Sequence, residues 1–285
     1  MTTPAYKAKA LQQAARKAAC ALLLCQAGAS QAAEVAAIIP SNTGPYAEAY
    51  AGFRAAMQGP FELYDLSKPG VTAPEEARYA VAFGAKAAAL QYPPGTHMVY
   101  ALTPVTGRGR GWHEISMAPA PGPALAAFKG LQPELKRLAV FWTAYPGETY
   151  ITRLRKAGEA AGIEIISSRL KNPDSFPERL RRLMGQMDAF WLMPDPALIT
   201  QSSVMVLASF SCANSIPFYA PTYALVTSGA TASFAPDFGE AGAAAARAAM
   251  ALYNGEGLAE VTYVDKVSLR VNEELKAKCR WPLKK

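Results

Sequence analysis

From Leu135 to Gly255 short apolar segments alternate with longer helical segments, and this pattern constrains the fold more than any other feature of the sequence. Strands are predicted at residues 135–142, 163–170, 187–194, 216–220 and 230–236. Helices are predicted at residues 145–162, 175–186, 196–214 and 237–255. Strands that alternate with helices form βαβ units, so we predict an α/β protein with parallel sheets covered on both faces.

The first part of the chain shows the same alternation. Strands are predicted at residues 34–40, 61–66, 79–83 and 97–104, and helices at residues 47–59, from residues 74–76 onward and after Gly84. Residues 103–123 differ, because prolines and glycines crowd into PVTGRGRGW and APAPGP. We predict a connection between two lobes there. A chain of 285 residues is long enough for two medium-sized domains.

The N-terminal segment has the composition of a secretory signal peptide. An apolar run at residues 18–29 is followed by small residues at Ser30 and Ala32, so residues 1–33 are predicted to be removed by cleavage after Ala32 or Ala33. The apolar run is too short to span a bilayer. A buried N-terminal helix is the alternative interpretation. The segment has no acidic residue and four basic ones, Lys7, Lys9, Arg16 and Lys17.

Cleavage changes what the charge implies. Loss of the four basic residues lowers the formal net charge from +7 to +3, and a nucleic-acid partner then loses its main support. No later segment is long and apolar enough to cross a membrane. We therefore expect a soluble protein in the periplasm. A lipid anchor at Cys25 is a minority alternative, since Leu24 stands where a small residue is normal.

Two cysteines, Cys212 and Cys279, remain after cleavage. An even pair in an oxidising compartment can form one disulfide. A buried thiol and a surface thiol are an equally good interpretation, because sequence does not give the distance between them.

One carboxylate stands between two prolines at the end of a predicted strand, in Pro194-Asp195-Pro196. In open parallel sheets ligands bind beyond the carboxyl ends of strands. Proline restricts the backbone and suits the first turn of a helix. Asp195 is therefore predicted to be held rigidly at the mouth of the fold. It can cap a helix that starts near Ala197, or it can hold a cationic group or a hydroxyl of a ligand.

Small polar or aromatic residues stand at other predicted strand ends. Each alone is typical of a cap or a turn, but together they indicate a cleft of the kind that binds small molecules. They are Ser41-Asn42-Thr43, Thr103, Thr143-Ala144-Tyr145, Tyr223 and Asp237.

Several longer motifs follow one another in a recognisable order. They are YAEAYAGF (46–53), FGAKA (83–87), LKRLAVFW (135–142), MDAFWLMPD (187–195), IPFYAPT (216–222), SGATASFAPDFGEAG (228–242) and VSLRVN (267–272). With them the chain resembles the ABC-transporter substrate-binding proteins of the family that includes bacterial tryptophan- and tyrosine-binding proteins. That family has the type I periplasmic-binding-protein fold.

The resemblance implies two Rossmann-like lobes with parallel sheets, joined by crossing strands, and a ligand cleft between them. Lobe 1 is expected to comprise residues 34–118 and 228–262, and lobe 2 residues 119–227 and 263–285. Asp237 is expected mainly to cap a helix, and Tyr46 offers a ring for stacking. The ligand-facing positions implied by the resemblance are Ser41, Asn42, Thr103, Thr143, Tyr145, Asp195, Thr200 and Tyr223.

Other functional classes find little support in the sequence. The two histidines, His97 and His113, lie in no zinc-protease pattern, there is no G-x-S-x-G elbow, and His113-Glu114 is interpreted as a loop pair. G-R-G-R-G at residues 107–111 lacks a P-loop lysine and serine and is interpreted as a basic loop. The cysteines lack zinc-site spacing. We expect no catalysis, cofactor or metal.

The expected function is capture of a small molecule, whose identity the sequence leaves open, for delivery to an ABC permease. The protein is expected to be a monomer. A periplasmic ligand sensor on the same fold is the alternative, and an enzyme with its active site in the cleft is a weaker one.

Overall fold

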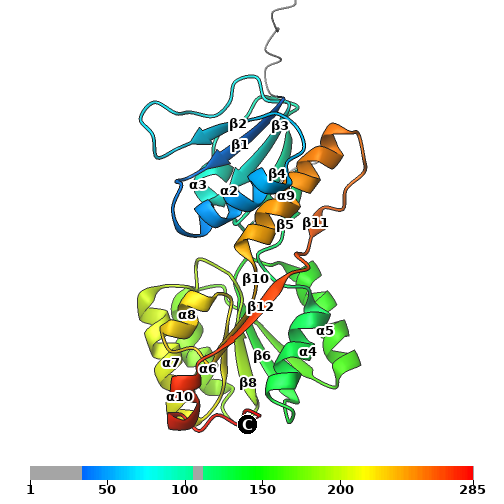
Figure 1. Ribbon diagram of the computed structural model, residues 1–285. Coiled ribbons are helices and arrows are strands. Elements are labelled where there is room, and N and C mark those ends of the chain that lie inside the picture. Colours follow the sequence, from blue (N-terminus) through cyan, green and yellow to red (C-terminus); the bar gives the residue numbers. More distant parts are fainter. Residues whose placement is uncertain (1–33, 105–111, 285) are drawn as a thin grey trace, which may run out of the picture.

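The computed structural model describes residues 34–104 and 112–284, which form two lobes, each built around its own sheet (Figure 1). The predicted signal peptide, Cys25 and the stretch at residues 107–111 lie outside the described residues. None of the helices in the two described ranges has the length and apolar character needed to cross a membrane.

The sheet of the first lobe has the strand order β11-β5-β4-β3-β1-β2, and its paired strands are parallel. All residues of β1 and β3 are buried, which explains why both strands read as continuous apolar runs. The strands are β1 (Val35–Ile39), β2 (Phe61–Asp65), β3 (Tyr79–Phe83), β4 (His97–Ala101), β5 (Trp112–Ile115) and β11 (Val261–Thr262).

Three helices belong to this lobe: α2 (Gly44–Ala56), α3 (Gly84–Ala88) and α9 (Phe238–Tyr253). Helices α2 and α9 lie together on one face of the sheet, and α3 packs on the other (Figure 1). Asp237 caps α9 as predicted, since its side chain accepts a hydrogen bond from the backbone N–H of Glu240.

The sheet of the second lobe has the strand order β12-β10-β9-β8-β6-β7. Its strands pair in parallel except for β12, which is antiparallel to β10. Parallel sheets in both lobes confirm the predicted α/β class. The strands are β6 (Arg137–Trp142), β7 (Glu164–Arg169), β8 (Ala189–Leu192), β9 (Phe218–Ala220), β10 (Ala232–Pro236) and β12 (Val267–Val271).

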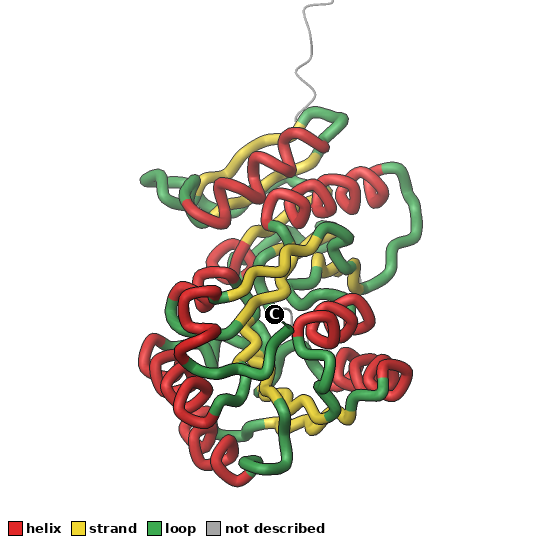
Figure 2. Tube along the Cα trace, turned by 60° about the horizontal axis from the view of Figure 1, so that its bottom comes forward, coloured by secondary structure: helices red, strands yellow, loops and turns green. Residues whose placement is uncertain are grey.

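Helices lie on both sides of this second sheet (Figure 2). Helices α4 and α5 cover one face, where Phe128 stacks on Tyr219 with ring centroids 4.1 Å apart. Helices α6 and α7 cover the other face, where Leu180 and Leu207 join the same apolar cluster. The helical segments are α4 (Pro121–Leu131), α5 (Glu148–Ala161), η1 (Pro173–Ser175), α6 (Phe176–Arg182), α7 (Gln201–Asn214), α8 (Tyr223–Thr227) and α10 (Glu273–Lys278).

The chain crosses between the lobes between β5 and α4, between β10 and α9, and between β11 and β12. The second crossing corrects an expected lobe boundary, because residues 228–236 were assigned to lobe 1. Strand β10 pairs with β9 and β12, and Phe234 packs in the second core, so the chain returns to the first lobe only after Pro236.

Two local predictions are corrected. The stretch at residues 103–123 is not only a connection, because residues 112–115 form β5 beside β4 and the prolines of residues 121–123 begin α4. No helix follows residues 74–76, where the chain instead makes bends before it enters β3 at Tyr79. Too few residues precede that strand to propagate a helix.

Helices α2 and α9 cross at backbone contact. A Cβ atom on Gly52 would lie 1.8 Å from the carbonyl oxygen of Gly239, and a Cβ atom on Gly242 would lie 1.8 Å from the carbonyl oxygen of Ala49. Only glycine fits at these two positions, so the crossing depends on them. Buried alanines of α9 extend the contact along the sheet.

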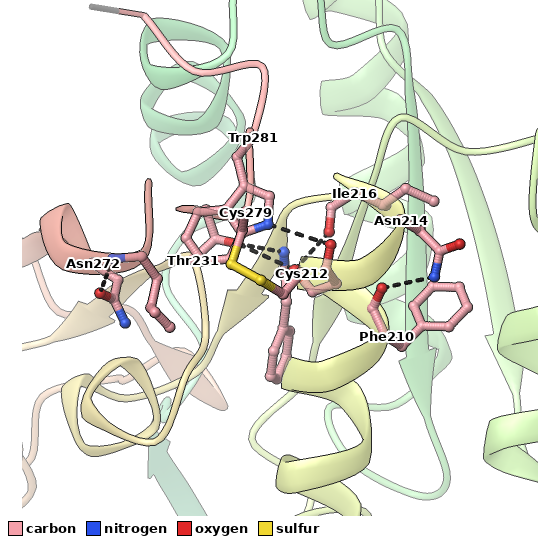
Figure 3. Close-up of a disulfide and its surroundings, with 11 residues drawn as sticks. Phe210, Cys212, Asn214, Ile216, Thr231, Asn272, Cys279 and Trp281 are labelled. Carbon is pink, nitrogen blue, oxygen red and sulfur yellow. Dashed lines mark hydrogen bonds between the residues drawn. A yellow bond between two sulfur atoms is a disulfide. The ribbon is translucent and has the colours of Figure 1, made fainter. Parts of the chain in front are cut away.

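A disulfide joins Cys212 in α7 to Cys279, which follows α10 (Figure 3). The sequence left open whether these cysteines are bonded or free, and in the structure they are bonded. Trp281, which is buried, donates a hydrogen bond from its indole N–H to the carbonyl oxygen of Ser211 at 3.4 Å. Because α10 buries none of its own residues, the disulfide and Trp281 hold the C-terminal segment on the second lobe.

We expect Gly52→Ala and Gly242→Ala each to lower the free energy of unfolding by at least about 2 kcal/mol, since the new methyl group forces the helices apart. Gly130→Ala is the matched control. Gly130 is an exposed helical residue of α4 with no atom within 4 Å of a built Cβ, so the change should stabilise by roughly 0.5 kcal/mol. Urea unfolding of the wild type and the three variants measures the free energies of unfolding. Midpoints of Gly52→Ala and Gly242→Ala equal to that of the wild type would contradict the close crossing of the helices.

Candidate ligand-binding site between the lobes

The carboxyl ends of both parallel sheets lie at the junction of the lobes. Strands β5 and β11 are parallel to the rest of the first sheet, and each leaves at its carboxyl end toward the second lobe. Strand β10 is parallel to β9 and leaves at its carboxyl end toward the first lobe. The loops that follow the strands therefore face one another, which is where ligands bind in open α/β sheets.

In the first lobe, the predicted residues are Ser41, Asn42, Tyr46 and Thr103. Asn42 is exposed, and the hydroxyl of Ser41 lies 3.0 Å from that of Thr43. Thr103, after β4, is 2% exposed. These four positions follow the carboxyl ends of β1 and β4.

The ring of Tyr46 lies over Gly84, at the end of β3. A Cβ atom on Gly84 would meet that ring at 2.6 Å, and its φ of +76° also favours glycine. The missing side chain at Gly84 therefore leaves the space that the Tyr46 ring occupies.

Asp195 ties two loops of the second lobe together. It is 3% exposed. Its Oδ2 accepts hydrogen bonds from the backbone N–H of Thr143 at 2.7 Å, the Thr143 hydroxyl at 2.6 Å and the backbone N–H of Ala144 at 3.2 Å. Its Oδ1 accepts from the backbone N–H of Ala197 at 3.1 Å. The carboxylate is thus occupied by the protein itself.

The predicted helix start near Ala197 is wrong, because α7 begins at Gln201. Its N-cap is Thr200, whose hydroxyl accepts from the backbone N–H of Ser203, while the Ser203 hydroxyl accepts from the backbone N–H of Thr200. This reciprocal capping box fixes the helix start without Asp195. Thr200 also lines a hollow of about 250 Å³ whose walls all come from the second lobe.

Tyr145 connects the second lobe to the first. Its side chain is 2% exposed, and its hydroxyl donates to Oε1 of Glu114 on β5 at 2.7 Å. The same hydroxyl accepts from the backbone N–H of Met117, in the first crossing, at 3.0 Å. Tyr145 therefore holds the two lobes together at the first crossing rather than presenting a free ring.

Burial dominates the electrostatics of this contact. Glu114 is 4% exposed. Burial raises the pKa of Glu114 to about 7, and the hydrogen bond from Tyr145 offsets only part of that effect. Burial and the neighbouring Glu114 carboxyl also raise the pKa of Tyr145 well above its ordinary value. Tyr145 therefore keeps its phenol proton and donates it to the Glu114 carboxylate when Glu114 is ionised.

The hollows between the described parts of the two lobes include two that differ in character. One, of about 20 Å³, is small and apolar, with Leu102 and Ile115 on one side and Pro194 and Pro221 on the other. The second is polar and has a volume of about 450 Å³. Its first-lobe wall includes Glu48, and its second-lobe wall includes Tyr223, which is 57% exposed.

The predicted residues of the second lobe thus differ in what they contact. Thr143 and Asp195 bond each other, Tyr145 bonds across the lobes, and Tyr223 lines the polar hollow. Thr200 lies apart on the second lobe. The residues that sequence reasoning missed are Glu114, Ser233, Ser268 and Arg270.

Signals for two of the missed residues were present in the sequence. The alternation in VSLRVN places Ser268 and Arg270 on one face of a strand. His113-Glu114, interpreted as a loop pair, lies in β5 instead. Within residues 34–104 and 112–284 no group of three or more His, Cys, Asp or Glu side chains is arranged to hold a metal ion.

Comparison with known proteins identifies the class. A family model described as ABC transporter substrate binding protein matches residues 124–278, more than half of the chain. No curated protein matches the chain.

Solved structures with the same fold include three at low sequence identity. An ABC domain in complex with L-Trp from Streptococcus pneumoniae has 13% identity and a TM-score of 0.57, covering 87% of this chain and 95% of that one. A ligand-free, open substrate binding protein with adhesive properties from Clostridium difficile has 15% identity and a TM-score of 0.59, with coverages of 87% and 94%. A conserved domain protein from Vibrio cholerae has 14% identity and a TM-score of 0.58, with coverages of 90% and 97%.

Two lobes with facing carboxyl strand ends and three crossings define a type I periplasmic-binding-protein fold, which confirms the predicted architecture. The chain belongs to the ABC transporter substrate binding protein family.

We expect Asp195→Asn to lower the free energy of unfolding by about 3 kcal/mol, because buried N–H donors lose a charged acceptor. Thr143→Val removes only one hydroxyl donor and should cost about 1 kcal/mol. Urea unfolding of both variants checks whether Asp195→Asn loses more free energy of unfolding than Thr143→Val. A stable Asp195→Asn protein that loses ligand affinity would instead place the carboxylate in direct contact with the ligand.

The Glu114 carboxyl should make stability depend on pH. Its folded-state pKa of about 7 lies above the ordinary value of 4.5, so at pH below 4.5 it is neutral in both states. As pH rises, the unfolded state ionises first, and the folded state loses about 3 kcal/mol of relative stability by pH 8.

Glu114→Gln keeps an acceptor for Tyr145 and removes the ionisable group. Urea unfolding at pH 4.5, 6 and 8 should therefore show the variant gaining on the wild type as pH rises. A constant difference across these three pH values would contradict the raised pKa.

Proposed function

We propose that this chain is an exported solute-binding protein that captures a small molecule between its lobes and delivers it to an ABC-type importer. The observation that carries the proposal is the meeting of the carboxyl strand ends of both sheets at one junction, beside a hollow with walls from both lobes. Family membership supports transport as the context.

The three crossings support capture by closure. They lie after β5, β10 and β11, so both lobes can rotate about the same few backbone segments. A ligand that contacts both walls favours the closed arrangement because it gains contacts available in no other state. In this mechanism the protein performs no covalent chemistry.

Several features support export. The sequence of residues 1–33 has a basic region, an apolar run and small residues in the order of a signal peptide. A disulfide between Cys212 and Cys279 is typical of an oxidising compartment such as the periplasm.

The ligand contacts that we propose come from exposed or half-buried strand-end residues of both lobes. Ser41, Asn42 and Tyr46 are the proposed contacts from the first lobe, and Tyr223 is the proposed contact from the second lobe. Thr103 follows β4 and is buried. Asp195, Thr143 and Tyr145 act through loop position, because their polar atoms are bonded within the protein.

A ligand screen followed by scattering tests the proposal. Amino acids, nucleobases, sugars and small organic acids are tested by thermal shift, and a ligand at one hundred times its Kd should stabilise the fold by about 2.7 kcal/mol. The same ligand should reduce the radius of gyration measured by small-angle X-ray scattering. Stabilisation with no compaction would contradict capture between the lobes.

Two variants and one cellular measurement complete the test. Asn42→Ala should weaken binding, and Gly130→Ala, on the distant helix α4, should not. Deletion of the gene should abolish uptake of the ligand by cells. Normal uptake in the deletion strain would contradict delivery to an importer.

A further inference from the structure

The polar hollow of about 450 Å³ between the lobes has features of a built anion site. Its second-lobe wall is formed by the start of α8 and by the neighbouring strands β10 and β12. Its first-lobe wall comes from α2 and the start of α9. These residues lie beside the second crossing, where the chain passes from β10 to α9.

Arg270 on β12 brings a positive charge to this hollow. Its guanidinium carbon lies 6.0 Å from the centroid of the Tyr223 ring, a cation–π arrangement that holds the side chain over α8. Arg270 is exposed and forms no ion pair with any carboxylate in the described part of the chain. Its donors are free to bind an anion.

A buried hydroxyl stands directly opposite Arg270. Ser233 on β10 is the register partner of Arg270 and is fully buried. Its Oγ has no hydrogen-bond partner among the described residues, although it belongs to the lining of the hollow. An unpaired buried hydroxyl is destabilising, and a ligand acceptor that reaches it would remove that cost.

The strand pairing places a second hydroxyl nearby. Ser268 is two residues before Arg270 on β12, so both side chains point to the same face of the sheet. Phe234 and Ala232 of β10 pack in the core on the face of α4 and α5. Ser233 therefore points to the opposite face, the side of α8 and the hollow.

The first-lobe wall limits the charge that the ligand can carry. Glu48 and Asp237 both line it. Asp237 is partly neutralised, since its carboxylate caps α9 and lies 3.7 Å from the Lys266 ammonium. Glu48 is exposed on α2. The two carboxylates repel a ligand more strongly the more negative charge it carries, so the hollow favours a monoanion over a phosphate dianion.

We propose that Arg270, with the hydroxyls of Ser233 and Ser268, binds the carboxylate of a small organic acid held between the lobes. The planar guanidinium matches a carboxylate with two parallel hydrogen bonds. This inference rests on the proposed function, because it names the chemical group by which the captured ligand is recognised. It makes an edge strand of the second lobe, rather than the strand-end loops alone, part of the binding site.

The test compares carboxylates with uncharged analogues. The probes are benzoate, lactate, succinate and the standard amino acids, each paired with its primary amide, and inorganic phosphate. Calorimetry with the full mature chain should show at least one carboxylate that binds about tenfold or more tightly than its amide. Phosphate should not bind.

Variants of the hollow locate the binding. Arg270→Gln should weaken the carboxylate at least tenfold and leave its amide unchanged, and Arg270→Lys should restore part of the affinity. Ser233→Ala should weaken it several-fold. Arg155→Gln is the matched control, because Arg155 is an exposed arginine on α5, which covers the other face of the second sheet.

The failures of the two proposals are distinguishable. A neutral ligand that binds wild type and Arg270→Gln equally, with compaction, would leave capture between the lobes intact and overturn the carboxylate site. Equal affinity of a carboxylate for wild type and Arg270→Gln would also overturn it, as would binding of phosphate in place of carboxylates. Binding of no probe, charged or neutral, would count against both.

Discussion

The contact between α2 and α9 is the constraint on which the architecture depends. In sequence, helix α9 is separated from strands β1 to β5 of its lobe by the elements α4 to β10 of the second lobe, and it covers the first sheet beside α2 at backbone distance. Gly52 and Gly242 permit that approach. Because α9 follows β10 directly, the position of this helix determines where the chain leaves the sheet of the second lobe at the second crossing. It therefore also determines how the two walls of the polar hollow face each other.

The alternation of apolar strands and helices predicted most elements, both parallel sheets and the two-lobed class, because burial on both faces leaves a direct record in runs such as VAAII and AFWL. It missed β5, whose four residues are flanked by glycines and prolines that locally favour turns. It also placed residues 228–236 in the wrong lobe. Strand pairing decides that boundary, and pairing is a long-range property that local pattern does not contain.

Parallel topology predicts the end of each sheet at which a site would lie, but it does not predict the role of each residue there. The role of each residue depends on contacts between segments far apart in sequence. Asp195 accepts a hydrogen bond from Thr143, and Tyr145 donates one to Glu114, so these polar groups already have partners within the protein. Arg270 and Ser233, in contrast, are candidate ligand-binding residues because they lack such hydrogen-bond partners among the described residues. The sequence does not show this, because it depends on the pairing of β10 with β12.

The bonding of Asp195 has a consequence for redesign. The Asp195 carboxylate accepts four hydrogen bonds from two loops and thereby fixes the conformation of both loops. The loops are preorganised in this way before any solute binds. A library intended to change which solute the protein prefers should therefore keep that residue and its partners constant. Diversity belongs on the opposing walls, where side chains can be exchanged without loosening the loops beneath them.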